Sequence, residues 1–296
     1  MRKIRIGSRD SVLAVRQAQI VMETVKESKI DIEFELVKIK TAGDKILDRS
    51  LEEVGGKGLF IKELEQALIN GDIDIAVHSY KDMPYEETEG LPIVALSERE
   101  APFDVLVLPE GVKEPDRSKP VGSSSSRRSI QFRKMYEGFD IKPVRGNVPT
   151  RIAKLDRGEY SALILAQAGL NRLSLGHRIS RVFPIGEMIP SGSQGIIAVQ
   201  GRDGEDYSYL QCFHCTESEI VSAAERTYLK ALKCDCTSPV AVYGEILGDG
   251  LTLVLTGMLA DVNGKVNTGK ILGKTTDAKL IGEELAKQLI TEANDR

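Results

Sequence analysis

The chain has 296 residues, of which 41% are hydrophobic and 28% are charged, and its formal net charge at neutral pH is -4. This composition is that of a globular protein, and the length is sufficient for two or three domains. Because the charges nearly balance, nothing indicates nucleic acid or an acidic membrane as a partner, and any anion binding has to be local. The sequence shows neither a signal peptide nor a run that could span a bilayer, so we expect a cytoplasmic protein.

The first part of the chain alternates between predicted strands and helices. The expected elements are strand Lys3–Ile6, helix Val12–Glu27, strand Asp31–Lys40, helix Gly58–Ile69 and a strand that begins at Asp72. Ser11 or Asp10 is suited to cap the first helix. Such alternation predicts right-handed crossovers and a largely parallel sheet that binds ligands at the carboxyl ends of its strands.

The stretch Asp72–Pro84, with the sequence DIDIAVHSYKDMP, contains a candidate site. Ser79, Lys81 and Asp82 directly follow its β-branched run, so they should lie at the carboxyl end of a strand. A Lys-Asp pair is usually a solvated turn, but the glycine-rich segment Gly55–Phe60 and arginine clusters further along favour a site. We predict that Asp82 is a buried carboxylate that faces basic groups, suited to acid–base work or to stabilising a cation.

A second α/β unit is predicted after the charged stretch Ser97–Pro102, where we expect an interdomain hinge. Its expected elements are a helix from Ser129, strand Lys142–Val144, a helix near Pro149–Leu155 and strand Ala162–Leu165. The loop Gly122–Arg128 (GSSSSRR) could be a flexible linker, or an anion site at a helix N-terminus. Its direct entry into Arg-Arg and a helix favours the anion site, and the absence of a Walker spacing argues against a nucleotide.

Arginines recur near strand–helix junctions of both units: Arg9, Arg145, Arg151 and Arg172. A single such arginine is usually a surface residue. A series at comparable junctions predicts a binding site for a substrate that carries several carboxylates.

The last part of the chain predicts a small α+β domain. Before it, the expected strand Ile196–Val199 returns the chain to the first domain. The expected elements of the last domain are helix Glu217–Lys233, strands near Val240–Ile246, Leu251–Leu259 and Lys265–Leu272, and helix Asp277–Glu292. The predicted fold class is α/β, with two doubly wound domains like those of periplasmic binding proteins and a C-terminal α+β domain with a three-stranded antiparallel sheet. The expected domains are residues 1–97 with 198–215, residues 98–197, and residues 216–296.

Four cysteines lie close together in the sequence: Cys212, Cys215, Cys234 and Cys236. In a cytoplasmic protein of this size a disulfide framework is not expected. The spacing C-x-x-C followed by C-x-C, with His214 alongside, has the residue types of a zinc site. Inert thiols, a metal site and covalent chemistry all remain open from the residues alone.

Seven short stretches occur in a defined order along nearly the whole chain. They are SRDSVLA at Ser8–Ala14, GGKGLF at Gly55–Phe60, HSYKDMP at His78–Pro84, GSSSSRR at Gly122–Arg128, RGNVPTR at Arg145–Arg151, LAQAGLNRL at Leu165–Leu173 and AERTYL at Ala224–Leu229. Together they resemble the porphobilinogen deaminase family, also called hydroxymethylbilane synthases. Each stretch alone is weak evidence, whereas seven in the family's order are highly specific.

The resemblance implies an enzyme that joins four porphobilinogen molecules head to tail, releases ammonia at each step and liberates the linear tetrapyrrole hydroxymethylbilane for haem biosynthesis. It also implies a covalent dipyrromethane cofactor, made from substrate and held by a thioether to a cysteine three residues before a proline, which here selects Cys236 before Pro239. The implied catalytic carboxylate is Asp82, which would assist deamination and stabilise positively charged intermediates.

The resemblance further implies which residues bind the carboxylates of cofactor and substrate. The implied cofactor-binding residues are Cys236, Lys81, Ser79, Ser125, Arg127, Arg128 and Asp82. The implied substrate-binding residues are Arg9, Ser11, Arg145, Arg151 and Arg172. No metal is implied, and we expect a monomer that acts on a small molecule.

Two other functions compete with the transferase. A non-catalytic bilobal protein that binds a polycarboxylate would need the arginines, but neither Asp82 nor a covalently loaded cysteine. A zinc-stabilised domain would use the four cysteines, and zinc would then occupy the thiolate that the cofactor needs. The zinc site and the covalent cofactor therefore exclude one another.

Overall fold

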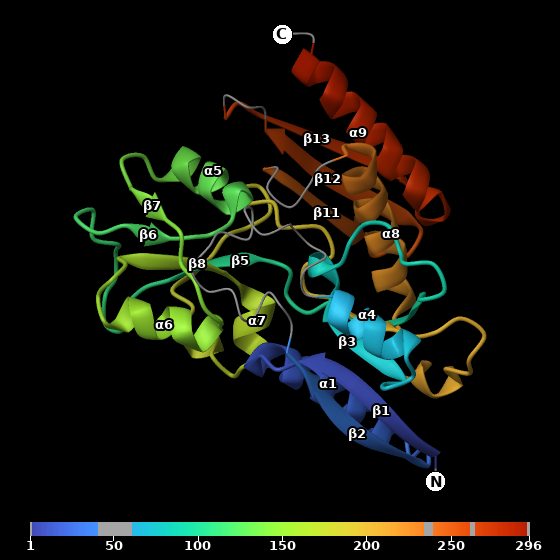
Figure 1. Cartoon of the computed structure of the whole chain (residues 1–296). Helices are drawn as coiled ribbons and strands as arrows, with labels where there is room; N and C mark the ends of the chain where they lie inside the picture. Colours follow the sequence, from blue (N-terminus) through green and yellow to red (C-terminus); the bar gives the residue numbers. More distant parts are fainter. Residues whose placement is uncertain (1, 41–60, 234–238, 261–263, 295–296) are drawn as a thin grey trace. The chain divides into compact units, whose positions relative to one another are not determined.

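The computed structural model describes residues 2–40, 61–233, 239–260 and 264–294 (Figure 1). These residues form two compact units, one of Met1–Glu100 with Gly195–Glu219 and one of Ala101–Gln194 with Ile220–Arg296. In the described part of the chain, no helix is long and apolar enough to cross a membrane.

The first unit contains a five-stranded sheet with the strand order β2-β1-β3-β10-β4. Its strands are β1 (Arg2–Arg9), β2 (Ile32–Ile39), β3 (Ile75–Ser79), β4 (Ile93–Leu96) and β10 (Ile197–Gln200). β1 pairs in parallel with β2 and β3, whereas β10 runs antiparallel to β3 and β4. The sheet is therefore mixed rather than largely parallel as expected, and the carboxyl ends of β1 and β3 meet at one edge.

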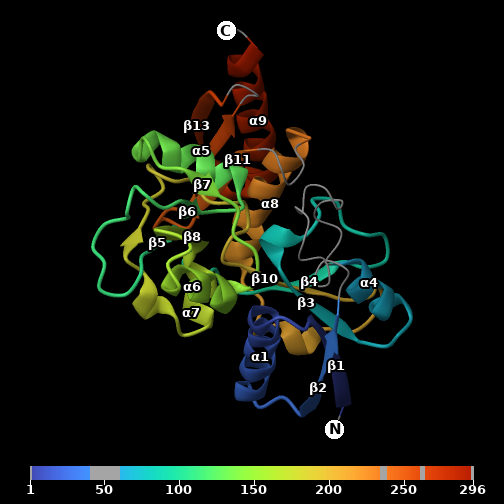
Figure 2. The same cartoon turned by 60° about the vertical axis from the view of Figure 1, so that its left-hand side comes forward.

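Helices cover both faces of this sheet (Figure 2). α1 (Val12–Glu27) packs against the face to which Val77 of β3 points. α4 (Lys62–Ile69) packs against the other face, to which Ala76 points. Successive side chains of a strand point to opposite faces, so the near-continuous apolar run of β3 follows from its burial on both sides.

The second unit contains a sheet of the same design, in the order β7-β6-β8-β5-β9. Its strands are β5 (Asp104–Val107), β6 (Val121–Gly122), β7 (Ile141–Lys142), β8 (Ala162–Ala166) and β9 (Arg181–Val182). Its helices are α5 (Ser126–Met135), α6 (Val148–Asp156), α7 (Gln167–Arg172) and the 3-10 helix η3 (Gly176–Arg178). β6 is parallel to β7 and β8, and β5 is antiparallel to β8 and β9. Both sheets thus have three parallel strands followed by one antiparallel strand.

The C-terminal part of the second unit is a three-stranded antiparallel sheet with helices along one face (Figure 1). Its elements are α8 (Thr216–Ala231), which enters this unit at Ile220, β11 (Val240–Ile246), β12 (Thr252–Ala260), β13 (Val266–Lys274), the 3-10 helix η5 (Thr275–Asp277) and α9 (Ala278–Asn294). The Tyr228 hydroxyl of α8 donates a hydrogen bond of 2.9 Å to the carbonyl of Met258. This bond satisfies a buried hydroxyl where α8 contacts the sheet.

The predicted fold class is confirmed, because two α/β sheets of mixed direction precede a C-terminal antiparallel sheet with helices. The helix expected from Ser129 begins three residues earlier, at Ser126. The reason is that Ser125 caps it, its hydroxyl accepting a hydrogen bond of 3.4 Å from the backbone N–H of Arg128. Of the helix expected at Gly58–Ile69, residues 58–60 lie outside the described residues.

Gly282 in α9 lies at a close approach between α9 and α8. A Cβ at this position would lie 2.4 Å from the carbonyl oxygen of Ala224 and 3.0 Å from the amide nitrogen of Tyr228. We predict that Gly282→Ala lowers the free energy of unfolding by about 1–3 kcal/mol through overpacking, although alanine favours a helix by about 1 kcal/mol over glycine. Thermal denaturation tests this, with the exposed Lys287→Ala as control. A variant as stable as the parent would contradict the close packing.

Candidate functional site

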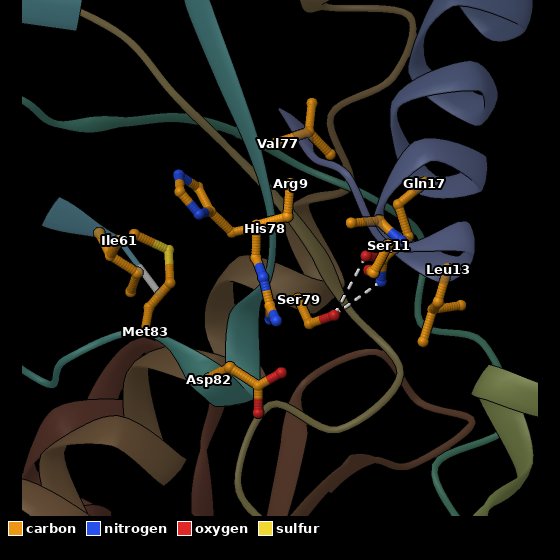
Figure 3. Close-up of a pocket in the computed structure, with 11 residues that line it drawn as sticks. Arg9, Ser11, Leu13, Gln17, Ile61, Val77, His78, Ser79, Asp82 and Met83 are labelled. Atoms are coloured by element: carbon orange, nitrogen blue, oxygen red, sulfur yellow. Dashed lines mark hydrogen bonds between the residues drawn. The ribbon is translucent and has the colours of Figure 1, made fainter. Parts of the chain in front are cut away.

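One pocket in the first unit collects several of the predicted site residues (Figure 3). Its polar lining residues are Arg9, Ser11, Gln17, His78, Ser79 and Asp82. Its apolar lining residues are Leu13, Ala14, Ile61, Val77 and Met83. The sequence predicts four of these as site residues, and it assigns no role to Gln17 or His78.

The pocket forms where two parallel strands end next to each other. The register pairs Gly7 of β1 with Ala76 of β3, so Arg9 and Ser79, at the ends of these strands, are brought together. Ser11 lies two residues beyond β1 as the N-cap of α1. A guanidinium and two hydroxyls at the carboxyl edge of a sheet are suited to bind a carboxylate.

Asp82 lies in the short 3-10 helix η2 (Tyr80–Asp82), which follows β3. Its side chain is exposed, so the prediction of a buried carboxylate is wrong. The physical reason is that β3 ends at Ser79, and the short helix η2 that follows it buries only Tyr80 among its three residues. Asp82 nevertheless lines the same pocket as Arg9, whose guanidinium points toward it in Figure 3. Lys81 lies in the same turn but is not a lining residue.

His78 is a buried imidazole in the wall of this pocket, with 6% of its surface exposed. Burial lowers its pKa from 6.5 to about 4, the side chain of Gln200 opposes this shift, and the positive charge of Arg9 adds to it. Its Nε2 has no hydrogen-bond partner in the described part of the chain. The ring is therefore neutral at physiological pH and adds no charge next to Arg9.

The serine run that follows β6 is an ordered turn in the second unit. The Ser124 hydroxyl donates a hydrogen bond of 2.8 Å to the carbonyl of Val144 and accepts one of 3.0 Å from its N–H. Ser125 caps α5. These bonds fix the backbone next to a helix N-terminus, as the anion-site interpretation requires and the linker interpretation does not.

Arg127 and Arg128 are buried in the second unit and share one buried carboxylate, that of Asp104. Arg127 Nη1 donates to Asp104 Oδ2 at 2.6 Å. Arg128 Nε donates to Asp104 Oδ1 at 2.9 Å, and its Nη2 lies 2.8 Å from the same oxygen. Gln194 Nε2 donates to this oxygen at 3.1 Å. Sequence reasoning missed Asp104, although an acid at the start of the apolar strand DVLV was an available signal.

The Asp104–Arg127–Arg128 cluster carries more positive than negative charge. Burial would raise the pKa of Asp104, but the two guanidinium charges and hydrogen bonds from Arg127 and Gln194 outweigh it and hold the pKa well below its usual range. Arg127 also donates to the carbonyl of Ile189 at 2.7 Å. Buried charges are normally paired, so two guanidiniums around one carboxylate are suited to receive an anion.

The other predicted arginines of the second unit are partly exposed. Arg145 follows β7, Arg151 lies in α6 and Arg172 ends α7. Arg151 Nε donates to the carbonyl of Gly146 at 2.7 Å, so its position is fixed by the turn before α6. The structure thus separates the predicted site arginines of this unit into a buried pair and a partly exposed set of three.

Two of the four cysteines lie among the described residues. Cys212 is exposed and Cys215 is partly buried, whereas Cys234 and Cys236 lie outside the described residues. The backbone N–H of Cys215 donates to the carbonyl of Leu96 at 2.8 Å. Within the described residues, no group of three or more His, Cys, Asp and Glu side chains could hold a metal ion.

Two protein-family models match the chain. The model of the porphobilinogen deaminase dipyromethane cofactor binding domain matches residues 4–209, and the model of the porphobilinogen deaminase C-terminal domain matches residues 220–291. The chain belongs to the porphobilinogen deaminase family.

Relatives named porphobilinogen deaminase are similar to this chain over almost its full length. The relative from Acetivibrio thermocellus is 53% identical over 292 residues, which are 99% of this chain and 99% of that one. The relative from Alkaliphilus oremlandii is 52% identical over 287 residues, 97% of this chain and 96% of that one. Solved structures give a weaker likeness: the methionine binding protein MetQ is 13% identical, covers 78% of this chain and 94% of its own, and has a TM-score of 0.45.

The described residues of this porphobilinogen deaminase family member fit a cofactor that carries carboxylates. The Asp104–Arg127–Arg128 cluster has an excess positive charge in a buried place. The pocket of the first unit combines Arg9 with the hydroxyls of Ser11 and Ser79. Guanidinium forks and hydroxyl donors are the groups that bind carboxylates in proteins.

We predict that Asp104→Asn lowers the free energy of unfolding at pH 7 by about 3–5 kcal/mol, since it leaves two buried guanidiniums without a counter-charge. The folded-state pKa of Asp104 is below that of the unfolded chain. Its stabilisation is therefore complete above the unfolded pKa of about 3.9 and is lost as the pH falls toward the folded pKa. Denaturant titrations from pH 8 to pH 3 should show a constant difference in unfolding free energy between the parent and Asp104→Asn, and this difference should shrink only below about pH 4.

The matched control for this prediction is Asp140→Asn, which removes an exposed carboxylate 3.6 Å from Lys142. We expect it to change stability by less than about 0.5 kcal/mol. Equal stabilities of the Asp104 and Asp140 variants would contradict the assignment of the buried cluster.

Proposed function

We propose that this chain is a transferase that deaminates four porphobilinogen molecules and joins them head to tail into hydroxymethylbilane, on a covalently bound dipyrromethane primer, in haem biosynthesis. The observation that carries the proposal is that porphobilinogen deaminase family models match residues 4–209 and 220–291. The pocket lined by Arg9, Ser11, Ser79 and Asp82 supports it. The guanidinium and the two hydroxyls can bind a carboxylate of the substrate or primer, and Asp82 supplies a carboxylate of the protein's own. We place the enzyme in the cytoplasm as a monomer, with neither nucleic acid nor membrane as partner.

The pocket residues have two chemical tasks in this proposal. Arg9 and Ser11 bind a carboxylate of the substrate, and Ser79 and Lys81 bind one of the primer. Asp82 offers an anion opposite the positive charge that develops on the pyrrole ring when ammonia leaves. Burial keeps His78, in the wall of the same pocket, neutral, so the imidazole adds no positive charge there.

The second unit supplies further carboxylate-binding groups in the proposal. Arg127, Arg128 and Ser125 bind the primer, whereas Arg145, Arg151 and Arg172 bind substrate. Asp104 holds the first two arginines in place, so their guanidiniums are ordered before a ligand arrives.

Cys236, which lies outside the described residues, is the proposed attachment point of the primer. The bound dipyrromethane supplies the pyrrole end to which the first substrate is joined. The chain's own residues bind its carboxylates and hold the anion of Asp82 near the reacting ring. Each porphobilinogen brings two carboxylates, so a growing product needs many guanidinium partners.

We predict that Asp82→Asn folds and carries the primer but loses about 100-fold or more of its turnover, because an amide supplies no anionic charge. Consumption of porphobilinogen by purified protein measures this, with Glu87→Gln in the following turn as a control that should keep parental turnover. Parental turnover in Asp82→Asn would remove this residue from the mechanism.

We predict that the purified protein is heavier than its sequence by a dipyrrole, and that this mass survives denaturation. Cys236→Ser should remove both the mass and the activity, because a serine hydroxyl is a poor nucleophile at neutral pH, whereas Cys234→Ser should keep both. Intact-mass and peptide-mass measurements decide this. Mass that maps to Cys234 would refute the attachment residue, and metal that chelation removes would favour a zinc-stabilised domain instead.

A further inference from the structure

Gln17 is a polar residue on the apolar face of α1. The buried residues of this helix are Ala14, Gln17, Ala18, Val21 and Val25. Their spacing of three or four places them on one helix face. Gln17 is 2% exposed, and a buried carboxamide costs free energy unless its polar atoms find partners. An apolar residue would be the default at this position, so the partner of Gln17 matters.

That partner is the hydroxyl of Ser79, in the wall of the pocket. Gln17 Nε2 lies 2.8 Å from Ser79 Oγ as a donor, and the Ser79 hydroxyl lies 3.1 Å from Gln17 Oε1. Figure 3 shows both contacts as dashed lines that meet at the hydroxyl oxygen of Ser79. The two residues are 62 positions apart in the sequence, and both line the pocket that contains Arg9.

The two contacts differ in what they require of the serine. A hydroxyl has one proton to donate and lone pairs to accept with. The bond from Gln17 Nε2 uses a lone pair, so it persists whichever way the proton points. The proton can turn from Gln17 Oε1, the longer contact, to an anion in the pocket. A hydroxyl that already accepts a hydrogen bond is polarised and becomes a stronger donor.

We propose that Gln17 is a positioning residue that holds Ser79 as a hydrogen-bond donor to a carboxylate bound at Arg9. The pairing of β1 with β3 brings Arg9 and Ser79 together, and a carboxylate accepts from a guanidinium and a hydroxyl at once. The inference rests on the proposed function. It differs from the assignment of Arg9 to the substrate and Ser79 to the primer in one respect: both residues bind the same carboxylate, which belongs either to porphobilinogen or to the dipyrromethane primer.

Two substitutions of Gln17 separate the parts of this proposal. Gln17→Leu removes both contacts with Ser79, and it places an apolar side chain on the apolar face of α1, so folding should be retained. Gln17→Glu keeps the shape, but its carboxylate only accepts and would capture the Ser79 proton. Gln19 is exposed on the same helix, so Gln19→Leu and Gln19→Glu are matched controls.

The measurements are KM and kcat for porphobilinogen, the thermal midpoint, and the intact mass of the purified protein. We expect Gln17→Leu and Ser79→Ala each to weaken carboxylate binding by about ten-fold, and Gln17→Glu by more. Adding Gln17→Leu to Ser79→Ala should cause no further loss, since Gln17 acts through Ser79. A raised KM with full dipyrrole mass assigns the carboxylate to the substrate, and a reduced dipyrrole mass assigns it to the primer.

Three results would overturn the inference. These are a Gln17→Leu protein with parental KM and dipyrrole mass, a further ten-fold loss when this change is added to Ser79→Ala, and a lowered thermal midpoint with both KM and dipyrrole mass parental, which a merely structural role would produce. A parent protein that does not consume porphobilinogen would contradict the proposed function, and this inference with it. The inference alone fails if the parent protein is active and the Gln17 variants have the parental KM and dipyrrole mass.

Discussion

In each unit, the position of the predicted site residues depends on the parallel pairing of strands. β1 pairs with β3, and β6 pairs with β8, in parallel. Parallel partners need a crossover between them, so the segments that meet at their carboxyl ends are far apart in the sequence. This pairing brings Arg9 to Ser79 in the first unit. In the second unit the same topology puts the serine run and its arginines directly after β6. The polar motifs recur because the same strand design occurs twice.

The two units compensate their arginine charges in different ways. Arg9 shares its pocket with Asp82, whose side chain is exposed and therefore accessible to a reacting group. Arg127 and Arg128 surround Asp104, which is fully buried. A buried ion cluster is costly to desolvate, and it fixes the geometry of its members when their hydrogen bonds are satisfied. The first arrangement suits chemistry on a ligand, and the second suits the ordered binding of a charged group.

Much of the fold could be predicted from periodicity and local chemistry. The bounds of α1 follow from an apolar face that repeats at helical spacing and from the cap at Ser11, and the three C-terminal strands lie within two residues of their expected ranges. The start of α5 was placed too late because a run of serines has no periodicity, and the decisive signal was the capping hydrogen bond of Ser125. Local patterns thus locate elements, but they locate ends only where a cap is recognisable.

The parts of the site that sequence reasoning missed depend on contacts between distant residues. Asp104 acquires its role from guanidiniums 23 and 24 positions away, and Gln17 acquires its role from a hydroxyl 62 positions away. In each case the available signal was a polar residue in an apolar stripe, which shows that a partner exists but does not identify it. The exposure of Asp82 depends on how η2 leaves the sheet, and no residue pattern specifies that direction.

The stoichiometry of the reaction with isotopically labelled porphobilinogen tests the account most directly. Purified protein should release four molecules of ammonia for each linear tetrapyrrole, every ring of the released product should carry the label, and the mass of the protein should be the same before and after turnover. Porphobilinogen that is bound but recovered unchanged would contradict the account, as would a released product that contains the unlabelled rings of the primer.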